Sequence, residues 1–557
     1  MLVVLFAAAI SAQTTKPAAT TPKETETGFP VTDKATIAKC GGCHRADKDG
    51  NLSRISWIRT TPEGWQQAIK RMVRLNGLSV TRNEGRQILR YLATNHGLAP
   101  EEAAPVQWYA EMRYLEAEAL PNDNVRDACA SCHPLARPES WRRSSVEWQE
   151  LVNMHLGYFP TMEYTSLRRR GGGRRPAVGP APGANPAEPQ RDPVDVALEH
   201  FRKAAPLHSK EWAAWRASLR DADLAGTWTV SASLAGKGKL FGTTEITATG
   251  PGEFTTKTKL LQVAGGPAQE FMGKVIVYTG YQWRGASKSG TTQVRETMLV
   301  SRDQSTIEGR WFWGAYQEFG YQVKMRRMGA DVSVAGTDVY AVKSGGASKV
   351  RVFGANFPAD VKAADIVMGA GVTVKSVSRV SAGELAVEAD VAAGAIAGPR
   401  DVVVRRVVAP AAFVVYDKVD YIRTATDSQL ARLGGNTHPK GYAQFEAIGY
   451  HRGPDNKART ADDIALGPVP VRWSVEEFFA RQNDDDKDYV GTLNDSGLFT
   501  PASEGPNPKR RFSTDNFGDI WVVATFANPG GEPLVAKGYL VVTVPMYVRY
   551  DQPEVAE

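Results

Sequence analysis

Each of the four cysteines in the chain belongs to a short motif that ends in histidine. Both motifs follow the Cys-x-x-Cys-His pattern by which c-type haem is attached. They read Cys40-Gly-Gly-Cys43-His44 and Cys129-Ala-Ser-Cys132-His133. Two thiols three positions apart can reach the two vinyl groups of one porphyrin, and the next imidazole can then bind the iron. The sequence therefore predicts two covalently bound haem c groups, with His44 and His133 as iron ligands.

Two other kinds of cysteine site fit this spacing less well. A zinc ribbon separates its cysteine pairs by about 15–20 residues, whereas Cys43 and Cys129 lie much further apart. A thioredoxin-like redox pair requires a surrounding βαβ unit, and the sequence shows none. Chance could supply one such motif, but two motifs that use every cysteine favour haem.

A haem iron that carries electrons also needs a second axial ligand, usually Met or His. After each motif the chain repeats one pattern, in which a tryptophan precedes a candidate ligand by seven positions. Trp65 precedes Met72, and Trp148 precedes His155. Seven residues are close to two helical turns, so each pair shares one face of a helix. We infer that Met72 and His155 complete the two haem sites; the alternative is that they only pack in a helix interface.

Capping signals predict a helix around each candidate ligand and a closing helix after it. The starts are Thr61-Pro62 and Ser144 for the ligand helices, and Thr81 to Glu84 and Asp192-Pro193 for the closing helices. The first closing helix is expected to end near Gly97.

Other histidines and methionines in this part are rival ligands. His96 and His200 belong to the closing helices and are expected at their surfaces or ends. Met154 precedes the candidate histidine by one residue, so it points about a hundred degrees away around the helix. Met112 and Met162 are interpreted as packing residues.

The N-terminal residues predict export. Residues 1–12 combine a short apolar run with small residues, as in a secretory signal peptide, although the usual basic n-region is missing. Residues 13–28 are rich in Thr, Pro, Lys and Glu and predict a disordered leader. No other segment is long and apolar enough for a transmembrane span. A periplasmic location is therefore expected.

Composition limits the remaining possibilities. A length of 557 residues predicts about three to five domains. The net charge of +6 is spread along the chain, which argues against a nucleic-acid partner. One arginine cluster lies within residues 168–191, a low-complexity stretch of Arg, Gly, Pro and Ala that is expected to be a surface insertion.

The predicted fold class is multidomain, with an α-helical di-haem cytochrome c domain at 29–222 followed by three all-β domains. Alternating hydrophobic patterns and glycine-rich turns predict an antiparallel β-barrel at 223–330. Two immunoglobulin-like β-sandwiches are expected at 331–416 and 417–557. One of the strands predicted in the first sandwich runs over 401–408.

Two acidic runs could be mistaken for calcium loops. Asp484 to Asp488 lacks the glycine and distal glutamate of an EF-hand, and Asp455 with Asp462-Asp463 is a weaker match still. Both are interpreted as solvated turns. No catalytic residue is predicted in this chain.

The chain resembles the α subunit of quinohaemoprotein amine dehydrogenase over nearly its whole length. The resemblance rests on the two haem motifs and on several further segments, of which Leu151 to Pro160 is the most specific. The others are Thr61-Pro-Glu-Gly-Trp65 with Arg71-Met72, Gly453-Pro-Asp with Thr460 to Asp463, Val490 to Leu493, and Gly497 to Pro501. The insertion at 168–191 and the long leader depart from the family pattern.

The resemblance implies a heterotrimer that oxidises a primary amine to an aldehyde with release of ammonia. In this family a small subunit carries the cysteine tryptophylquinone that does this chemistry, and a β-propeller subunit completes the assembly. The present chain would then pass electrons from the quinone through two haems to an external cytochrome c or blue copper protein. No thiol remains here to build a quinone.

Ligand type suggests a direction for the electrons. Met ligation raises a haem potential relative to ligation by two histidines. We therefore expect electrons to enter at the His133/His155 haem and to leave from the His44/Met72 haem. Two alternatives stay open: a stand-alone di-haem carrier with β-type binding domains, and a di-haem peroxidase, which needs one open iron position.

Overall fold

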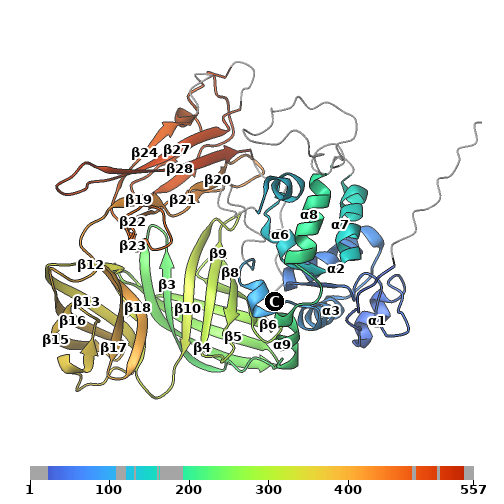
Figure 1. Ribbon diagram of the computed structural model, residues 1–557, viewed down its shortest axis with the longest axis horizontal. Helices are drawn as coiled ribbons and strands as arrows, with labels where there is room; N and C mark the ends of the chain where they lie inside the picture. The colour runs from blue at the N-terminus through green and yellow to red at the C-terminus, as the bar shows by residue number, and fades with distance from the viewer. Residues whose placement is uncertain are drawn as a thin grey trace, which may run out of the picture.

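The computed structural model describes residues 23–107, 121–130, 133–159, 162, 192–478, 484–510 and 515–544. Within them a group of helices is followed by three regions of β-structure (Figure 1). The predicted signal peptide (1–12) and insertion (168–191) lie outside the described residues, as do Cys132 and Met112. Among the described helices, none is both long and apolar enough to cross a membrane.

Nine α-helices and one π-helical turn, η1, lie in the described residues before the first long strand. They are α1 (Lys34–Cys40), α2 (Pro62–Asn76), α3 (Arg82–Asn95), α4 (Pro100–Ala103), α5 (Asp123–Val125), η1 (Arg126–Ala130), α6 (Ala136–Glu139), α7 (Ser145–Tyr158), α8 (Pro193–Ala204) and α9 (Lys210–Ala217).

The predicted helix starts are confirmed. Thr61 caps α2 by accepting a hydrogen bond from the backbone N–H of Gly64, and Ser144 caps α7 in the same way through the N–H of Glu147. The capping box predicted before α3 is present, and Asp192 caps α8. These caps satisfy backbone donors that the first turn of a helix cannot pair internally.

A short antiparallel ladder joins the two repeats. Strand β1 (Ile58–Thr60) runs directly into the cap of α2, and β2 (Trp141–Arg143) runs directly into the cap of α7. The two strands pair with Ile58 opposite Arg143 and Thr60 opposite Trp141. The two helices that carry Met72 and His155 therefore start from opposite ends of one ladder.

The prediction of a disordered leader over 13–28 is wrong for its last residues. Glu24 accepts a hydrogen bond from the Ser144 hydroxyl, and Glu26 accepts one from the backbone N–H of Ser145. Two carboxylates thus lie at the positive N-terminal end of α7, where negative charge is favourable. The Glu26 carbonyl also accepts a hydrogen bond from the Trp57 indole. Composition alone does not reveal these tertiary contacts.

The first β-region is a closed eight-stranded antiparallel barrel, as the alternating pattern predicted. Its strands are β3 (Gly226–Leu234), β4 (Gly238–Gly250), β5 (Glu253–Gln262), β6 (Gln269–Tyr278), β7 (Gln282–Ser289), β8 (Thr292–Val300), β9 (Thr306–Trp313) and β10 (Phe319–Arg327). Buried aromatic residues, among them Trp228, Trp283 and Trp311, fill its interior.

The barrel packs against the first repeat. The Thr279 hydroxyl donates to the Ala93 carbonyl at 2.7 Å, and the Tyr281 hydroxyl donates to the Leu98 carbonyl at 2.8 Å. Arg284 of β7 forms a buried ion pair with Glu63 in the first turn of α2. The barrel therefore supports the helix that carries Met72.

The second β-region contains two four-stranded sheets whose buried residues form one core. Its strands are β11 (Ser333–Thr337), β12 (Ala341–Lys343), β13 (Gly346–Ala355), β14 (Ile366–Val367), β15 (Val372–Ser381), β16 (Glu384–Val391), β17 (Gly398–Val404) and β18 (Val407–Tyr416). The single strand predicted over 401–408 is wrong: Arg405 adopts a positive φ of 58°, which turns the chain between β17 and β18.

The third β-region combines one four-stranded sheet with two three-stranded sheets. Its strands are β19 (Tyr421–Thr424), β20 (Ser428–Arg432), β21 (Ala443–Gln444), β22 (Ala447–His451), β23 (Ile464–Pro468), β24 (Arg472–Glu477), β25 (Gly491–Leu493), β26 (Leu498–Pro501), β27 (Gly518–Phe526) and β28 (Leu534–Thr543).

Carboxylates of the acidic run at 484–488 form ion pairs with an arginine of the same chain. Arg510 contacts both carboxylate oxygens of Asp486 at 2.9 Å and lies 3.4 Å from Asp484. In the other acidic loop, Asp463 accepts hydrogen bonds from Tyr421 and from the backbone N–H of Thr460. These carboxylates have protein partners. The interpretation of the first run as a solvated turn is wrong for Asp486, which is 3% exposed and begins a short 3-10 helix (Asp486–Asp488).

Candidate haem sites

The first Cys-x-x-Cys-His motif forms a tight turn at the end of α1. The backbone N–H groups of Cys43 and His44 both donate to the carbonyl of Cys40, at 3.2 and 2.9 Å. This turn brings the three residues of the motif together at one end of the helix. Cys43 is exposed, and Cys40 is half-buried. Burial, with a smaller effect of Cys43, raises the pKa of the Cys40 thiol.

Three of the predicted iron-ligand histidines share one hydrogen-bonding arrangement. The Nδ1 atom of His44 lies 2.8 Å from the Ser53 carbonyl, that of His133 lies 3.0 Å from the Pro134 carbonyl, and that of His155 lies 2.8 Å from the Leu151 carbonyl. A carbonyl oxygen can only accept, so Nδ1 must carry the proton in each ring. The lone pair then lies on Nε2, as metal ligation requires.

Met72 lies half-buried on α2, one residue after Arg71 and within the last two turns of that helix. Gly77 ends the helix in a left-handed conformation (φ 70°), and the Met72 carbonyl accepts a hydrogen bond from the backbone N–H of Leu78. Met72 and His155 both follow the N-cap of their helix by the same number of residues. The assignment of Met72 as a ligand stays a prediction.

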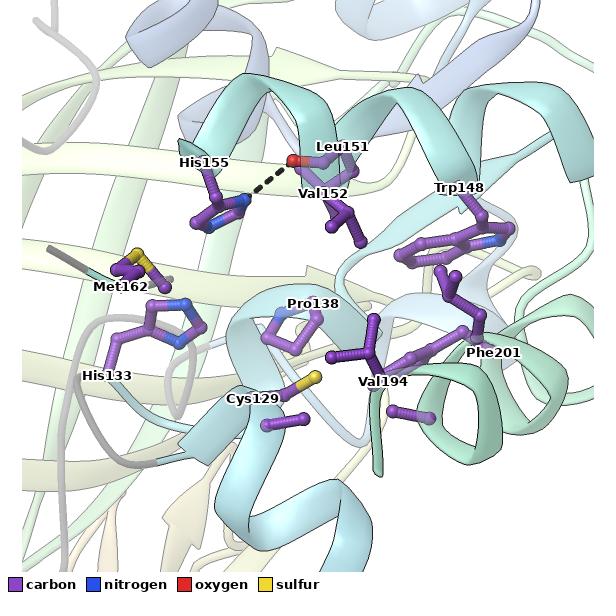
Figure 2. Close-up of a pocket in the computed structure, with 13 residues that line it drawn as sticks. Cys129, His133, Pro138, Trp148, Leu151, Val152, His155, Met162, Val194 and Phe201 are labelled. Atoms are coloured by element: carbon purple, nitrogen blue, oxygen red, sulfur yellow. Dashed lines mark hydrogen bonds between the residues drawn. The ribbon is translucent and has the colours of Figure 1, made fainter. Parts of the chain in front are cut away.

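The second motif opens onto an apolar cavity. The histidines of the motif and of α7, His133 and His155, both line it, together with Cys129 (Figure 2). Its remaining walls come from η1, α6, α7 and α8 and are nearly all apolar: Ala128, Pro138, Trp148, Leu151, Val152, Met162, Val194, Ala197, Leu198 and Phe201. The structure therefore brings together the described residues predicted for the second haem.

Burial shifts the pKa values of ionisable groups in this cavity. Desolvation lowers the pKa of His155, and the neighbouring Arg143 and Arg71 lower it further, against the effect of the Leu151 carbonyl. A neutral imidazole is the form that binds iron. Desolvation also raises the pKa of the Cys129 thiol to about 12. A thiol kept protonated suits a thioether better than a zinc–thiolate centre, which needs thiolates.

The rival histidines lie elsewhere. His96 is 0% exposed and packs among the rings of Phe29, Trp65 and Tyr91. Burial, reinforced by Arg216 and Arg59, lowers the pKa of His96 to about 3. The expectation that His96 lies at the surface is therefore wrong. Its expected place at a helix end is correct, because it is the C-cap of α3. His200 is half-buried and does not line the cavity.

Met162 lies at a position that the sequence analysis did not predict. It was predicted to pack, and it does contact apolar surroundings, but it lines the same cavity as His133 and His155 (Figure 2). Its sequence position gives no signal for this, because it falls outside the repeated spacing. Met154, the rival next to His155, does not line the cavity.

The two tryptophans of the repeat hold each ligand helix to its closing helix. The Trp65 indole donates to the His96 carbonyl at 2.8 Å, and the Trp148 indole donates to the Ala205 carbonyl at 3.2 Å. Both carbonyls belong to the C-cap of the closing helix, α3 or α8. The repeat inferred from spacing thus corresponds to the same tertiary contact made twice.

These residues fit an iron porphyrin. Imidazoles with Nε2 available, the cysteines Cys40 and Cys129 and a cavity walled by apolar side chains match what a buried haem requires. The donor set contains no carboxylate, which argues against a hard cation such as calcium or magnesium.

Comparison with models of protein families matches four parts of the chain. Residues 31–172 match the quinohemoprotein amine dehydrogenase A, alpha subunit, haem-binding family. Residues 221–328, 332–417 and 422–555 match domains II, III and IV of the quinohemoprotein amine dehydrogenase alpha subunit. No curated protein matches the chain.

Solved structures resemble only parts of the chain. A de novo designed fluorescence-activating beta barrel is 22% identical and covers 19% of this chain and 93% of its own, with a TM-score of 0.16. Mouse clustered PcdhgC3 EC1-3 is 11% identical and covers 43% and 75%, also with a TM-score of 0.16. The tandem Ig repeats of Dlar are 14% identical and cover 38% and 98%, with a TM-score of 0.13.

The four family matches follow one another along most of the sequence, and the first of them contains both Cys-x-x-Cys-His motifs. The chain therefore belongs to the family of quinohaemoprotein amine dehydrogenase α subunits.

Proposed function

We propose that this chain is the di-haem electron-transfer subunit of a periplasmic amine dehydrogenase. It would receive electrons from a quinone in a partner subunit, where a primary amine is oxidised to an aldehyde, and pass them to an external cytochrome c or blue copper protein. Two haem c groups would be bound covalently through Cys40 and Cys43 and through Cys129 and Cys132.

One observation carries this proposal most strongly. Three histidines at predicted ligand positions each donate from Nδ1 to a backbone carbonyl, which leaves Nε2 as the metal-binding atom. Two of them, His133 and His155, line one cavity with Cys129. Among the rival histidines, His96 has no hydrogen-bond partner for either ring nitrogen in the described part of the chain.

The haem iron would supply the electron-transfer chemistry by gaining and losing one electron. The residues of this chain would hold and insulate it. His44 and His133 would bind iron on one side, and Met72 and His155 on the other. The carbonyls of Ser53, Pro134 and Leu151 orient the three imidazoles. The apolar walls of the second cavity exclude water, which raises the cost of a charged iron and so influences its potential.

The proposed iron ligands distinguish this function from that of a peroxidase. A peroxidase needs an iron position that substrate can reach. In the described residues, His155 lines the second cavity opposite the haem motif (Figure 2). We propose that both irons have two protein ligands.

The β-regions would serve assembly. The barrel and the two-sheet region each have a closed hydrophobic core. We propose that the second and third β-regions are immunoglobulin-like, that the domain boundaries follow 29–222, 223–330, 331–416 and 417–557, and that a β-propeller subunit and a small quinone-bearing subunit complete a heterotrimer.

Native purification with mass spectrometry tests this function. A tag on this chain should capture a propeller protein and a small thioether-crosslinked protein, and adding a primary amine to the complex should reduce both haems. The His133→Ala variant should block reduction of the second haem. Purification of the chain without companions, with haems that an amine never reduces, would favour the stand-alone carrier.

A further inference from the structure

Trp141 lies between the two haem repeats. It is the first residue of β2, and it pairs with Thr60 of β1, the residue that precedes the cap of α2. Its side chain packs against the buried core of the first repeat and also against that of the second. Among the described residues of these two cores, only Trp141 is common to both. One side chain thus joins the interiors of the two repeats.

Each of these cores also contacts a cysteine of a haem motif. Cys40 packs against the first core, and Cys129 packs against the second. These cysteines are among the points at which the two porphyrins would be attached. Trp141 therefore contacts both of the cores that would lie beside the two cofactors.

A second aromatic ring connects Trp141 with the first repeat. The centres of the Trp141 and Trp65 rings are 6.4 Å apart, and their planes are tilted by 56°, as is usual for interacting aromatic pairs. Trp65 is 3% exposed. It lies on the face of α2 that carries Met72 about two turns later. The ring pair thus connects the ladder with the helix of the predicted ligand.

An arginine connects Trp141 with the second site. Trp141 and Arg143 are two positions apart on β2, so their side chains leave the same face of the strand. The guanidinium carbon of Arg143 lies 4.4 Å from the centre of the Trp141 ring and 5.8 Å from that of Trp148. Trp148 is 1% exposed and lines the cavity with His133 and His155 (Figure 2). Three indoles and one guanidinium thus form a line of close contacts between the repeats.

We propose that Trp141, in contact with Trp65 and Arg143, is the medium through which electrons tunnel between the two haem sites. Tunnelling weakens steeply with distance and is stronger through packed atoms than across a gap, so a row of π groups in contact favours it. One electron leaves one iron and enters the other, and the rings are neither oxidised nor protonated. This inference rests on the proposed function, since it needs both haems.

The charge of Arg143 disfavours oxidation of the rings themselves. Removing an electron from an indole leaves a positive charge, and a nearby cation raises the free energy of that state because like charges repel. Arg143 lies within cation–π distance of both Trp141 and Trp148. Glu147 lies 3.6 Å from Arg143 but is shared with Arg54, so it offsets only part of this charge. The arrangement favours tunnelling through the rings over a tryptophan radical.

Flash photoreduction of the complete complex tests the proposal, because it measures how fast an electron equilibrates between the two haems. Trp141→Leu should slow this exchange severalfold, and Trp141→Phe, which keeps an aromatic ring, should slow it less. Both haem potentials, measured by spectroelectrochemical titration, should stay unchanged, because Trp141 carries no charge and is not a predicted ligand.

Circular dichroism gives a second measurement that does not depend on electron transfer. Two indoles as close as Trp65 and Trp141 couple electronically. Trp141→Leu should therefore remove the coupled indole band from the far-ultraviolet spectrum of the complex.

Trp212→Leu is the matched control. Trp212 is also a buried indole with an arginine over its ring, since the guanidinium carbon of Arg59 lies 4.9 Å from the ring centre. It belongs to the core around the barrel and to neither of the two cores that contact Trp141. Its replacement should leave the exchange rate and both potentials unchanged.

The outcomes separate the two proposals. A purified complex without covalently bound haem would refute the proposed function. Two haems that exchange electrons as fast in Trp141→Leu as in the wild type would overturn only the present inference. Equal slowing by Trp212→Leu would also overturn it, because that result would indicate a general disturbance of the fold. An unchanged dichroism spectrum in Trp141→Leu would contradict the pairing of Trp141 with Trp65 and the inference with it.

Discussion

The two haem repeats use the same local structure in different surroundings. In each, a capped ligand helix is joined through a tryptophan indole to the C-cap of a closing helix. The closing helix of the first repeat, α3, packs on the barrel, whereas α8 packs on α5, η1 and α7. The repeat therefore specifies how each of these helices contacts its closing helix, and the neighbouring elements differ between the two repeats.

Apolar side chains near the two sites include both exposed and buried residues. On the first ligand helix Val73 and Leu75 are 42% and 60% exposed, and Ile37 of α1 is 43% exposed. The second site is walled by buried residues of α8, including Val194, Leu198 and Phe201. The predicted difference in ligand type and the surroundings of each site would both act on the reduction potential.

The largest expected effect is the loss of one cofactor from one repeat. Replacing Cys40 and Cys43 by alanine should remove half of the covalently bound haem, and replacing Cys129 and Cys132 should remove the other half. Thioether formation needs these thiols and no others are present. Pyridine haemochrome spectra and intact mass measure the haem content.

The second pair of substitutions should also destabilise the protein more, because it affects an apolar cavity inside a buried core. If either double variant folds and keeps both haems, the motifs do not attach haem independently and the comparison fails.

A medium effect is expected from exchanging the distal ligands. Met72→His should lower the potential of the first haem, and His155→Met should raise that of the second, because Met ligation favours ferrous iron. Potentiometric titration followed by visible spectra resolves both. Met154→Leu, next to His155 but outside the cavity, is the control.

Unchanged potentials and spectra in both exchange variants would mean that Met72 and His155 only pack. If only His155→Met changes the potential and spectrum, His155 is a ligand of the second haem and Met72 is not a ligand of the first.

The smallest effect concerns His96, which has Ala205 as its counterpart in the second repeat. Its folded-state pKa is about 3, below the ordinary value near 6.5. Between these values the unfolded chain binds a proton that the folded chain does not, so stability falls as pH drops from about 6.5 toward 3. His96→Phe should reduce this slope, by at most about 1.4 kcal/mol per pH unit.

Denaturant unfolding between pH 4 and pH 7 measures that slope, and His208→Phe, a change at an exposed histidine, is the control. Haem spectra should be the same in His96→Phe and in the wild type. Altered haem spectra would show that His96 is a ligand after all and that the first repeat was assigned wrongly.

Local signals predicted the elements of the haem part well. Thr61, Ser144 and Thr81 cap helices because their hydroxyls pair with backbone donors three residues ahead, an interaction contained within each segment. The seven-residue spacing after tryptophan likewise follows from helix geometry. Alternating residues predicted the barrel strands for the same reason.

The sequence patterns did not predict several tertiary contacts. Met162 enters the cavity wall outside any repeat, Glu26 fixes the end of the leader by pairing with a distant helix, and Arg405 turns a strand without glycine. Such features follow from long-range packing, which patterns within one segment do not encode.

The Glu102 carboxylate links the two repeats of the haem part. Glu102 pairs with Arg59 of β1 and with Arg142 of β2, and its pKa is held at about 2 by those partners against the effect of burial. Arg59 is fully enclosed. A chain cut between the repeats would separate Arg142 from Glu102, and breaking a buried ion pair costs up to about 3–5 kcal/mol. We therefore expect each half to be less stable alone than within the complete chain.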